Sequence, residues 1–379
     1  MKRSIKWIAF ALAFIMLIAL GIESKPLGER AVIVGLAIDK AGEEYEVSAQ
    51  IIIAGENDTK SSGSMISSVK AETISGALSR LSAETSMLVT MAHCNLIILG
   101  MDVIKTESYK VLDYLVRNAY LSENALVIAS ETTAKDVISC KTAHSEMSSF
   151  ALQRSLMVYG EYDDTVKKTA REFLADYHTH NSANWLTLVK KKETQKPQTN
   201  TNSGGASEQG GEEKYYVFDL SETAIIRGES YVFTASREMT VGMNFATQKL
   251  SKGSIYVEGD KGEKIELYIL SSKPRIRYDS DNLLATIELE LDLLVKEIIG
   301  EEDYDLSKVE LSESETKRVS ALVSRDVYAV FDECKARNVD VFDLYGGFYG
   351  RGRASWREKF GANYLPQSKI IVKTKIKYH

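Results

Sequence analysis

Residues 190–214 divide the chain into two parts, because this stretch (KKKETQKPQTNTNSGGASEQGGEEK) contains no Val, Leu, Ile, Met or aromatic residue. A segment of this composition cannot bury enough apolar surface to offset the entropy lost on ordering. We therefore predict a flexible linker or a long surface loop at 190–214 and place a domain boundary there. The boundary separates an N-terminal α+β domain at 27–189 from a C-terminal α+β domain at 215–379. A chain of 379 residues is long enough for two or three domains.

The amino terminus has the features of an export signal. It carries three basic residues, Lys2, Arg3 and Lys6. The run from Trp7 to Ile22 is uncharged and mostly apolar, and its length lies between that of a signal peptide and the ~20 residues of a spanning helix. The positive charges predict a cytoplasmic amino end and an extracytoplasmic body. Residues 1–22 are a signal peptide cleaved after Gly21 or an uncleaved membrane anchor, and we favour the anchor.

In the N-terminal part, segments with the period of a strand alternate with segments that have the period of an amphipathic helix. The run Ala31–Ile38 and the following EYEVSAQIII predict a β-hairpin. Further strands are predicted at CNLIILG and NALVIAS, and helices at 69–82, 109–118, TTAKDVI, roughly 145–157 and roughly 164–177. This alternation predicts helices packed on a sheet, and therefore an α+β fold.

The C-terminal part is rich in strands, and we predict an antiparallel sheet there. A short helix capped by Ser236 interrupts the strands, and a long helix at 313–338 begins with the capping-box pair Ser312 and Glu315. The last strand, IIVKTKIKYH, carries its lysines on one face. Such lysines solubilise an edge strand or approach anionic lipid headgroups. The complete prediction is an N-terminal signal or anchor helix followed by mixed sheets with packed helices, in two or three extracytoplasmic domains.

The titratable residues show no pattern typical of catalysis or metal binding. The net charge of −6 and pI near 5.6 provide no basic surface for nucleic acid. The chain has three cysteines, Cys94, Cys140 and Cys334, without CxxC spacing. They can form one disulfide at most, and we assign them no chemistry. His178 and His180 are close in sequence but lack accompanying ligands, so no metal site is predicted.

Motifs of the common hydrolases and nucleotide-binding proteins are missing as well: GxSxG, HExxH and a Walker loop do not occur. The segment GGFYGRGR at 346–353 lacks the lysine and hydroxyl of a phosphate loop, so we predict a turn-rich connector there. The sequence predicts a binding or structural module with no catalytic residue, no cofactor and no metal.

Three segments resemble the Ger(x)C family, the C subunits of bacterial spore germinant receptors. They are ERAVIVGLAIDKAGEEYEVSAQII, ETAIIRGESYVFTASREMTVGMNFATQKLSKGSIYV and VDVFDLYGGFYGRGRASWREKF. The landmarks of the resemblance are Asp39, Thr223-Ala224, Asp340 and Trp356. The likeness spans nearly the whole chain.

The resemblance implies an α+β lipoprotein on the outer face of the spore inner membrane. It also implies that the protein acts together with two integral-membrane subunits, an A-type and a transporter-like B-type. In such a receptor, small nutrients trigger germination. It implies no catalytic residue. This chain departs from the family where a lipidated cysteine is usual, because Gly21-Ile22-Glu23 stand there and the nearest cysteine is Cys94. The apolar run remains able to hold the protein to the membrane.

For partner contact we select Arg351, Arg353 and Trp356, an aromatic residue among arginines in a glycine-rich loop. The alternative for Trp356 is a place in the core beside the long helix. Two other function classes stay open at this point: an extracytoplasmic envelope structural or secretion-associated protein, and an extracytoplasmic enzyme with an unrecognised site.

Overall fold

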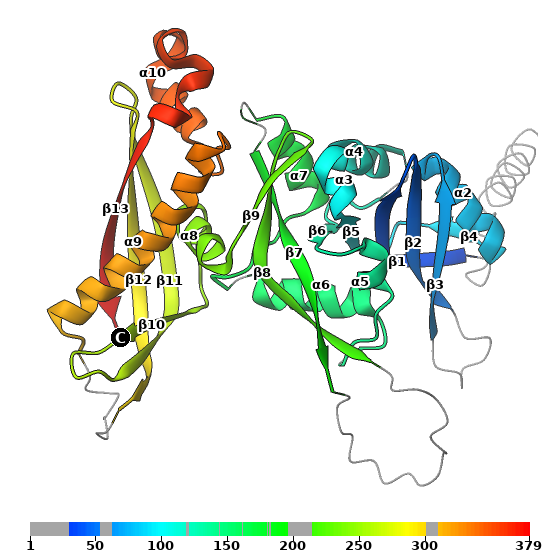
Figure 1. The fold of residues 1–379 in the computed structure, drawn as a ribbon, viewed down its shortest axis with the longest axis horizontal. Helices are drawn as coiled ribbons and strands as arrows, with labels where there is room; N and C mark the ends of the chain where they lie inside the picture. The colour runs from blue at the N-terminus through cyan, green and yellow to red at the C-terminus, as the bar shows by residue number, and fades with distance from the viewer. Residues whose placement is uncertain are drawn as a thin grey trace, which may run out of the picture.

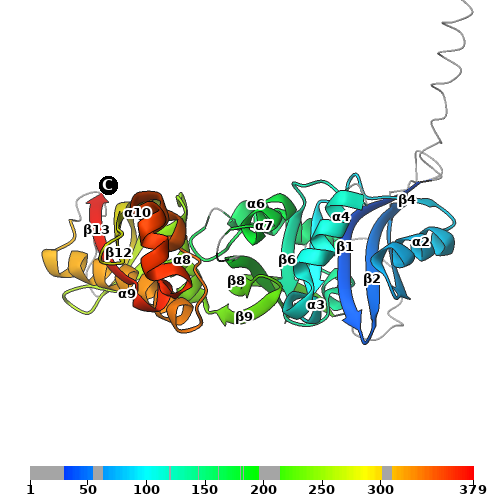
Figure 2. The same ribbon diagram turned by 90° about the horizontal axis from the view of Figure 1, so that it is seen from above.

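The computed structural model describes residues 30–53, 63–118, 121–143, 145–160, 162–179, 181, 183–195, 214–300 and 310–379. These residues form two lobes side by side, each built on one sheet (Figures 1 and 2). The predicted signal or anchor segment 1–22, including Gly21 and Ile22, lies outside the described residues.

The first lobe contains a nine-stranded sheet with the order β3-β2-β1-β5-β6-β7-β8-β9 and with β4 beside β1. Its strands are β1 (Arg30–Ala41), β2 (Glu44–Ile53), β3 (Gly63–Ala71), β4 (Leu88–Thr90), β5 (Leu96–Gly100), β6 (Leu126–Ser130), β7 (Ala183–Thr194), β8 (Tyr215–Arg227) and β9 (Ser230–Ala235). The predicted hairpin is confirmed as β1 and β2, which pair antiparallel. The central strands β5 and β6 are parallel and fully buried, which explains their unbroken apolar sequences.

Helices cover both faces of this sheet. They are α2 (Ile74–Thr85), α3 (Met101–Thr106), α4 (Ser108–Asn118), α5 (Ala134–Ile138), α6 (Ser148–Tyr159) and α7 (Ala170–Tyr177). Buried residues of α2, α3, α4 and α7 join one apolar core, and those of α5 and α6 join another on the opposite face. The predicted helix at 69–82 is partly wrong, because β3 continues to Ala71 and the helix begins only at Ile74.

The predicted domain boundary at 190–214 does not separate the two lobes. Residues 190–194 continue β7, and β7 pairs antiparallel with β8 on the far side of the segment, with Trp185 opposite Ile225. Residues 196–213 of the predicted linker lie outside the described residues. Composition shows that the stretch cannot form a core, but it does not show whether the strands that flank it pair.

The second lobe contains a four-stranded sheet with the order β10-β11-β12-β13. Its strands are β10 (Ser254–Glu258), β11 (Lys264–Asp279), β12 (Leu284–Ile299) and β13 (Lys369–Tyr378), and its long helix is α9 (Glu313–Ala336). The first three strands are antiparallel, but β12 and β13 are parallel, so the prediction of an antiparallel sheet is wrong for the last strand. The chain between β12 and β13 contains α9, the kind of crossover that parallel neighbours require.

The long helix behaves as its sequence predicts. Ser312 and Glu315 form the capping box, with the Glu315 amide donating to Ser312 Oγ at 3.1 Å and the Ser312 amide donating to Glu315 Oε2 at 2.8 Å. Val319, Val323 and Val330 of α9 lie in the same core as the buried residues of β12.

The two lobes are joined through α8 (Arg237–Thr247), which follows β9 and lies between the sheets (Figure 1). The Asn244 side chain donates to the carbonyls of Asp163 at 2.8 Å and Thr165 at 3.0 Å. On the other side, Gly242 contacts the backbone of Asp326 so closely that an added Cβ would lie 2.1 Å from its carbonyl oxygen. These contacts hold both lobes against one helix.

Candidate functional site

The residues selected for partner contact lie on a helix, α10 (Leu344–Phe360), and the predicted turn-rich connector at 346–353 is therefore wrong. Glycines are costly in a helix interior, and this helix contains four of them. Two carboxylates fix its first turn. Asp343 accepts from the Gly346 amide at 3.2 Å, and the buried Asp340 accepts from the amides of Leu344 and Tyr345 at 3.0 and 2.9 Å.

Close packing explains why glycine is needed at two of these positions. A Cβ on Gly347 would lie 2.1 Å from the ring of Tyr278, and one on Gly352 would lie 2.5 Å from Cβ of Trp356. The close approach of Gly347 to Tyr278 lets the helix lie against β11. Periodicity could not have revealed it, since glycine has no side chain to contribute to an apolar stripe.

Trp356 lies in the core, so it is not a surface contact and the alternative weighed for it is confirmed. Its exposed fraction is 3%. The ring packs against Tyr345, Phe348 and Tyr364, with centroid separations of 5.2, 6.0 and 5.7 Å. Its role in α10 is to hold the helix to the lobe.

Arg351 is exposed, as a contact residue must be, and the Arg353 side chain lies outside what the structure describes. Arg357 and Lys359 are also exposed on α10, and Tyr349 has an exposed fraction of 40%. The helix stands at the tip of the second lobe (Figure 1). The exposed residues of α10 therefore include basic side chains, the carboxylate of Glu358 and one aromatic ring.

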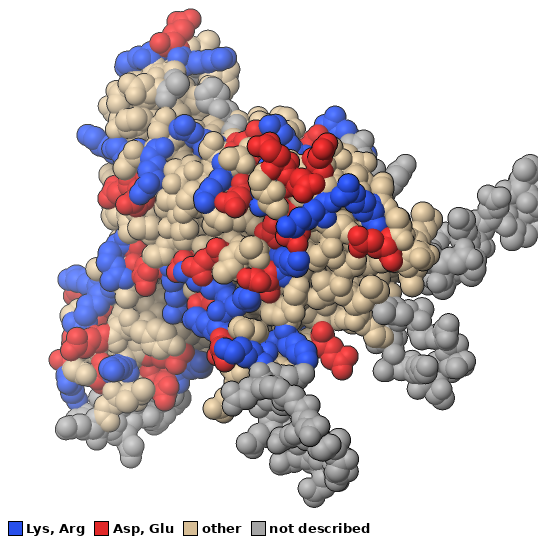
Figure 3. Space-filling view, turned by 45° about the vertical axis from the view of Figure 1, so that its right-hand side comes forward, with Lys and Arg blue, Asp and Glu red and all other residues tan. Residues whose placement is uncertain are grey.

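A cleft of about 490 Å³ lies between the two lobes and was missed by the sequence analysis. The first lobe lines it with Lys168, Asp176 and Trp185, and the second with Gln248, Pro274 and Asp343. These residues come from distant parts of the chain, and no local motif signals that they meet. Basic and acidic side chains are interspersed on the surface seen in Figure 3.

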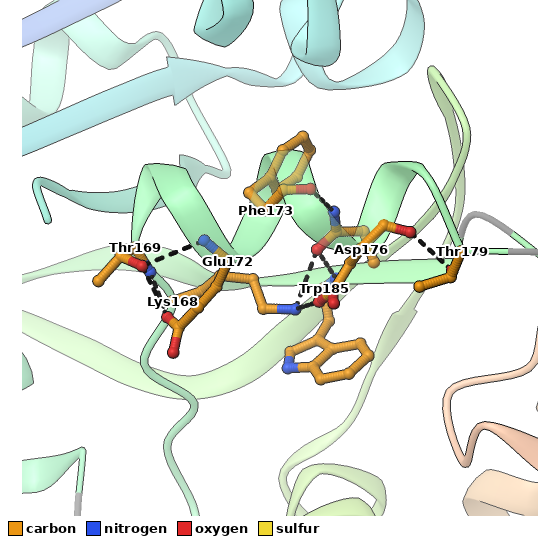
Figure 4. Close-up of polar contacts among 8 residues, drawn as sticks. Lys168, Thr169, Glu172, Phe173, Asp176, Thr179 and Trp185 are labelled. Atoms are coloured by element: carbon orange, nitrogen blue, oxygen red, sulfur yellow. Dashed lines mark hydrogen bonds and ion pairs between the residues drawn. The ribbon is translucent and has the colours of Figure 1, made fainter. Parts of the chain in front are cut away.

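Lys168 is the buried centre of a polar network in the cleft wall (Figure 4). Its ammonium pairs with Asp176, donates to Asn184 Oδ1 at 3.0 Å, and lies 3.4 Å from the ring centroid of Trp185. The Asn184 amide in turn donates to the Phe173 carbonyl at 2.7 Å. Burial lowers the pKa of Lys168, and the Asp176 carboxylate opposes this by favouring the charged form.

This network holds α7 on the sheet. Thr169 and Glu172 add a capping box at the start of α7, with the Thr169 amide donating to Glu172 Oε2 at 2.8 Å. The described residues that line the cleft include the hydroxyl of Thr247 and the amines of Lys167 and Lys168, but no Ser, Cys or His.

The histidines and cysteines have ordinary surroundings. His178 Nε2 lies 3.1 Å from the Tyr109 hydroxyl, while His180 lies outside the described residues. No group of three potential metal ligands occurs among the described residues. The three cysteines are unpaired, and burial raises the pKa of Cys94 to about 12 and that of Cys140 to about 11. Burial raises the pKa of Cys334 as well.

The landmarks of the family resemblance are structural. Asp39 accepts from the Ala134 and Lys135 amides at 2.7 and 2.8 Å, which joins β1 to α5. Thr223 Oγ1 lies 3.0 Å from Thr240 Oγ1, which joins β8 to α8. Asp340 accepts from the Tyr364 hydroxyl at 2.6 Å. These landmarks therefore specify the scaffold.

Comparison with known proteins identifies the class. Residues 23–191 match the family model described as spore germination protein N-terminal domain, and residues 221–379 match the model described as spore germination B3/GerAC like, C-terminal. The two models together cover most of the chain, and the gap between them, residues 192–220, contains most of the predicted linker. The chain is thus a spore germination protein, and the resemblance predicted from its sequence is confirmed. It belongs to the Ger(x)C family, the C subunits of spore germinant receptors.

Two individual proteins are similar to this chain. The crystal structure of the GerBC protein superposes with a TM-score of 0.52 at 16% identity, over 91% of this chain and 96% of that one, which shows the shared α+β fold. The putative spore germination protein YfkR of Bacillus subtilis (strain 168) is 25% identical over 147 residues. That stretch is 36% of this chain and 38% of the relative, so the match spans less than half of either protein.

Among the residues that the structure describes, no helix has the length and apolar character needed to cross a membrane.

Proposed function

We propose that this chain is a non-enzymatic, membrane-associated subunit of a spore germinant receptor. It acts with integral-membrane A-type and transporter-like B-type subunits in nutrient-triggered germination. The observation that carries the proposal is the match of both family models over residues 23–191 and 221–379. The basic amino end followed by the apolar run to Ile22 supports attachment at the extracytoplasmic face of the spore inner membrane.

We further propose that residues 1–22 are retained as the anchor. Mass spectrometry of the mature protein isolated from spore membranes measures this directly. A retained amino terminus supports anchoring by this segment, and a protein beginning at Ile22 contradicts it.

The exposed side of α10 is the proposed contact with a partner subunit. Arg351 and Arg353 lie in this helix, and Trp356, on the buried side of the same helix, packs it against the lobe. Arginine and tyrosine are enriched at protein interfaces, which supports a role for Arg351 together with the exposed Tyr349.

Deletion and complementation in spores test the proposal. Spores lacking the gene are expected to lose the response to at least one nutrient, and a normal response to every nutrient tried would contradict receptor function. The variant R351A/R353A is expected to reduce co-purification with the integral-membrane subunits. The matched control is R117A/R171A, which removes two arginines from α4 and α7. Equal co-purification of both variants would remove α10 as the contact.

A further inference from the structure

The outer face of the second lobe's sheet is open. Ala285, Ile287 and Leu289 of β12 are buried on the side where α9 packs, and α9 crosses that side in Figure 1. The alternate residues of β12, including Glu288 and Glu290, face the opposite side. The described residues of β12 and β13 on that opposite side are exposed or half-buried.

Strand register arranges charges on this open face in three columns. Arg275 of β11 and Lys373 of β13 both lie opposite Glu288. Lys375 of β13 lies opposite Glu290 in the same way. We name this surface the basic sheet face. Its basic residues are Lys273, Arg275, Arg277, Lys369, Lys373, Lys375 and Lys377, and its acidic residues are Asp279, Glu288, Glu290 and Asp292.

The positive charges of the basic sheet face exceed what its own carboxylates neutralise. Seven basic residues face four acidic ones, although the whole chain has a net charge of −6. The basic side chains are exposed, while the carboxylates of β12 are half-buried. Arg277 pairs with Glu288 at 2.9 Å and Arg275 with Glu290 at 3.8 Å, but Lys369, Lys373 and Lys375 have no carboxylate within 4.0 Å among the described residues.

The basic residues lie along both edges of this part of the sheet. Among the described strands, β13 pairs with β12 alone. Lys273, Arg275 and Arg277 lie beyond Tyr268, where the pairing of β11 with β10 ends. Protection of edge strands accounts for these charges, but it does not account for the apolar side chains that accompany them.

Exposed apolar side chains accompany the charges on the same face. Tyr256, Leu294 and Ile371 have exposed fractions of 61, 39 and 40%. A flat surface that carries both lysines and apolar side chains matches the interface of a bilayer, where apolar groups enter the headgroup layer. A lysine ammonium is a flexible point charge. It therefore suits a mobile lipid phosphate better than it suits a protein carboxylate of fixed geometry.

We propose that the basic sheet face rests on the anionic surface of a lipid bilayer, with the lysines of β13 beside lipid phosphates. The inference rests on the proposed membrane association and adds the orientation of the second lobe. Its tests separate attachment by the amino-terminal segment from attachment by this face.

The first test is lysine labelling of the full chain in vesicles. An amine-reactive reagent labels the accessible lysines, and mass spectrometry measures the labelling of each one. The labelling is compared between vesicles of phosphatidylcholine alone and vesicles of phosphatidylcholine with phosphatidylglycerol. We expect labelling of Lys373 and Lys375 to fall severalfold in the anionic vesicles and to recover in 1 M salt, where the Debye length is about 3 Å. Lys105 and Lys317 serve as controls on α3 and α9 and should label equally in both.

The second test compares two variants that each remove three positive charges, K373Q/K375Q/K377Q and K105Q/K110Q/K317Q. At roughly fivefold per lysine, the first should lose a preference for anionic over neutral vesicles on the order of 100-fold, and the second should keep it. The inference is overturned if the first variant keeps the full preference for anionic vesicles. It is also overturned if Lys373 and Lys375 are protected from labelling only in native membranes that contain the other subunits. Flotation with neutral vesicles reports attachment by the amino-terminal segment alone. Failure of the protein to float with neutral vesicles contradicts the proposed anchoring. The preference for anionic vesicles is measured separately and tests the basic sheet face.

Discussion

Replacing Gly347 by alanine tests the packing that holds α10 on its sheet. Helix propensity alone favours alanine by about 1 kcal/mol. The added Cβ, however, would lie 2.1 Å from the ring of Tyr278, where ordinary contact begins near 3.4 Å. The ring cannot swing away freely, because it packs edge-on against Phe348 at a centroid distance of 5.6 Å. Overpacking costs about 1–3 kcal/mol, and this displacement places it at the upper end, for a net loss of about 2 kcal/mol.

Gly350 provides the matched control, since a Cβ there would have no neighbour within 4 Å. Gly350→Ala should therefore stabilise the protein by about 1 kcal/mol. The two variants should differ by about 3 kcal/mol, or on the order of 6–12 °C in Tm. Tryptophan fluorescence during thermal unfolding is the assay, because Trp356 lies on the buried side of the helix. If Gly347→Ala is as stable as Gly350→Ala, the packing of α10 described above is incorrect.

Three further changes follow from single contacts. Ser312→Ala removes a capping-box acceptor of α9 and should cost about 1 kcal/mol in urea unfolding, with Ser312→Asn restoring most of it. Lys168→Met leaves Asp176 without its ammonium partner and should cost about 2 kcal/mol; unchanged stability would show that the pair contributes nothing. Burial, and secondarily Asp164, raises the pKa of Asp163 from 3.8 to about 7, so the folded state holds a proton that the unfolded state releases. Stability should therefore fall as pH rises from about 4 to 7, and Asp163→Asn should remove that slope when unfolding free energies are compared at pH 5 and pH 8.

Elements with a local signal could be predicted from the sequence. The hairpin of β1 and β2 follows from alternation around a short turn, and α9 follows from its capping box and its apolar stripe. Ser236 caps α8 as expected, and Thr133 caps α5 in the same way, since a cap is a contact between residues three apart. These features depend on neighbours in sequence, which is why they were visible without the fold.

Features that depend on distant contacts could not be predicted. The pairing of β7 with β8 crosses residues 190–214, and the parallel pairing of β12 with β13 is made possible by α9 and α10 between them. The helix α10 is hidden because its glycines make room for the ring of Tyr278, a contact with another element. The cleft joins Lys168 to Asp343 across two lobes, and nothing in either segment indicates the other.

The family landmarks are buried, whereas the surfaces proposed for contact with membrane and partner are exposed. Asp39, Thr223, Asp340 and Trp356 are all buried, and each joins two elements of the scaffold. Residues of this kind specify how the lobes are built, and they leave the outer surface free to vary. Both surfaces with unneutralised positive charge that we single out, the exposed side of α10 and the basic sheet face, belong to the second lobe. The two proposals therefore place the contacts with membrane and partner on one lobe, and α8 joins that lobe to the first through its contacts with Asp163, Thr165 and Asp326.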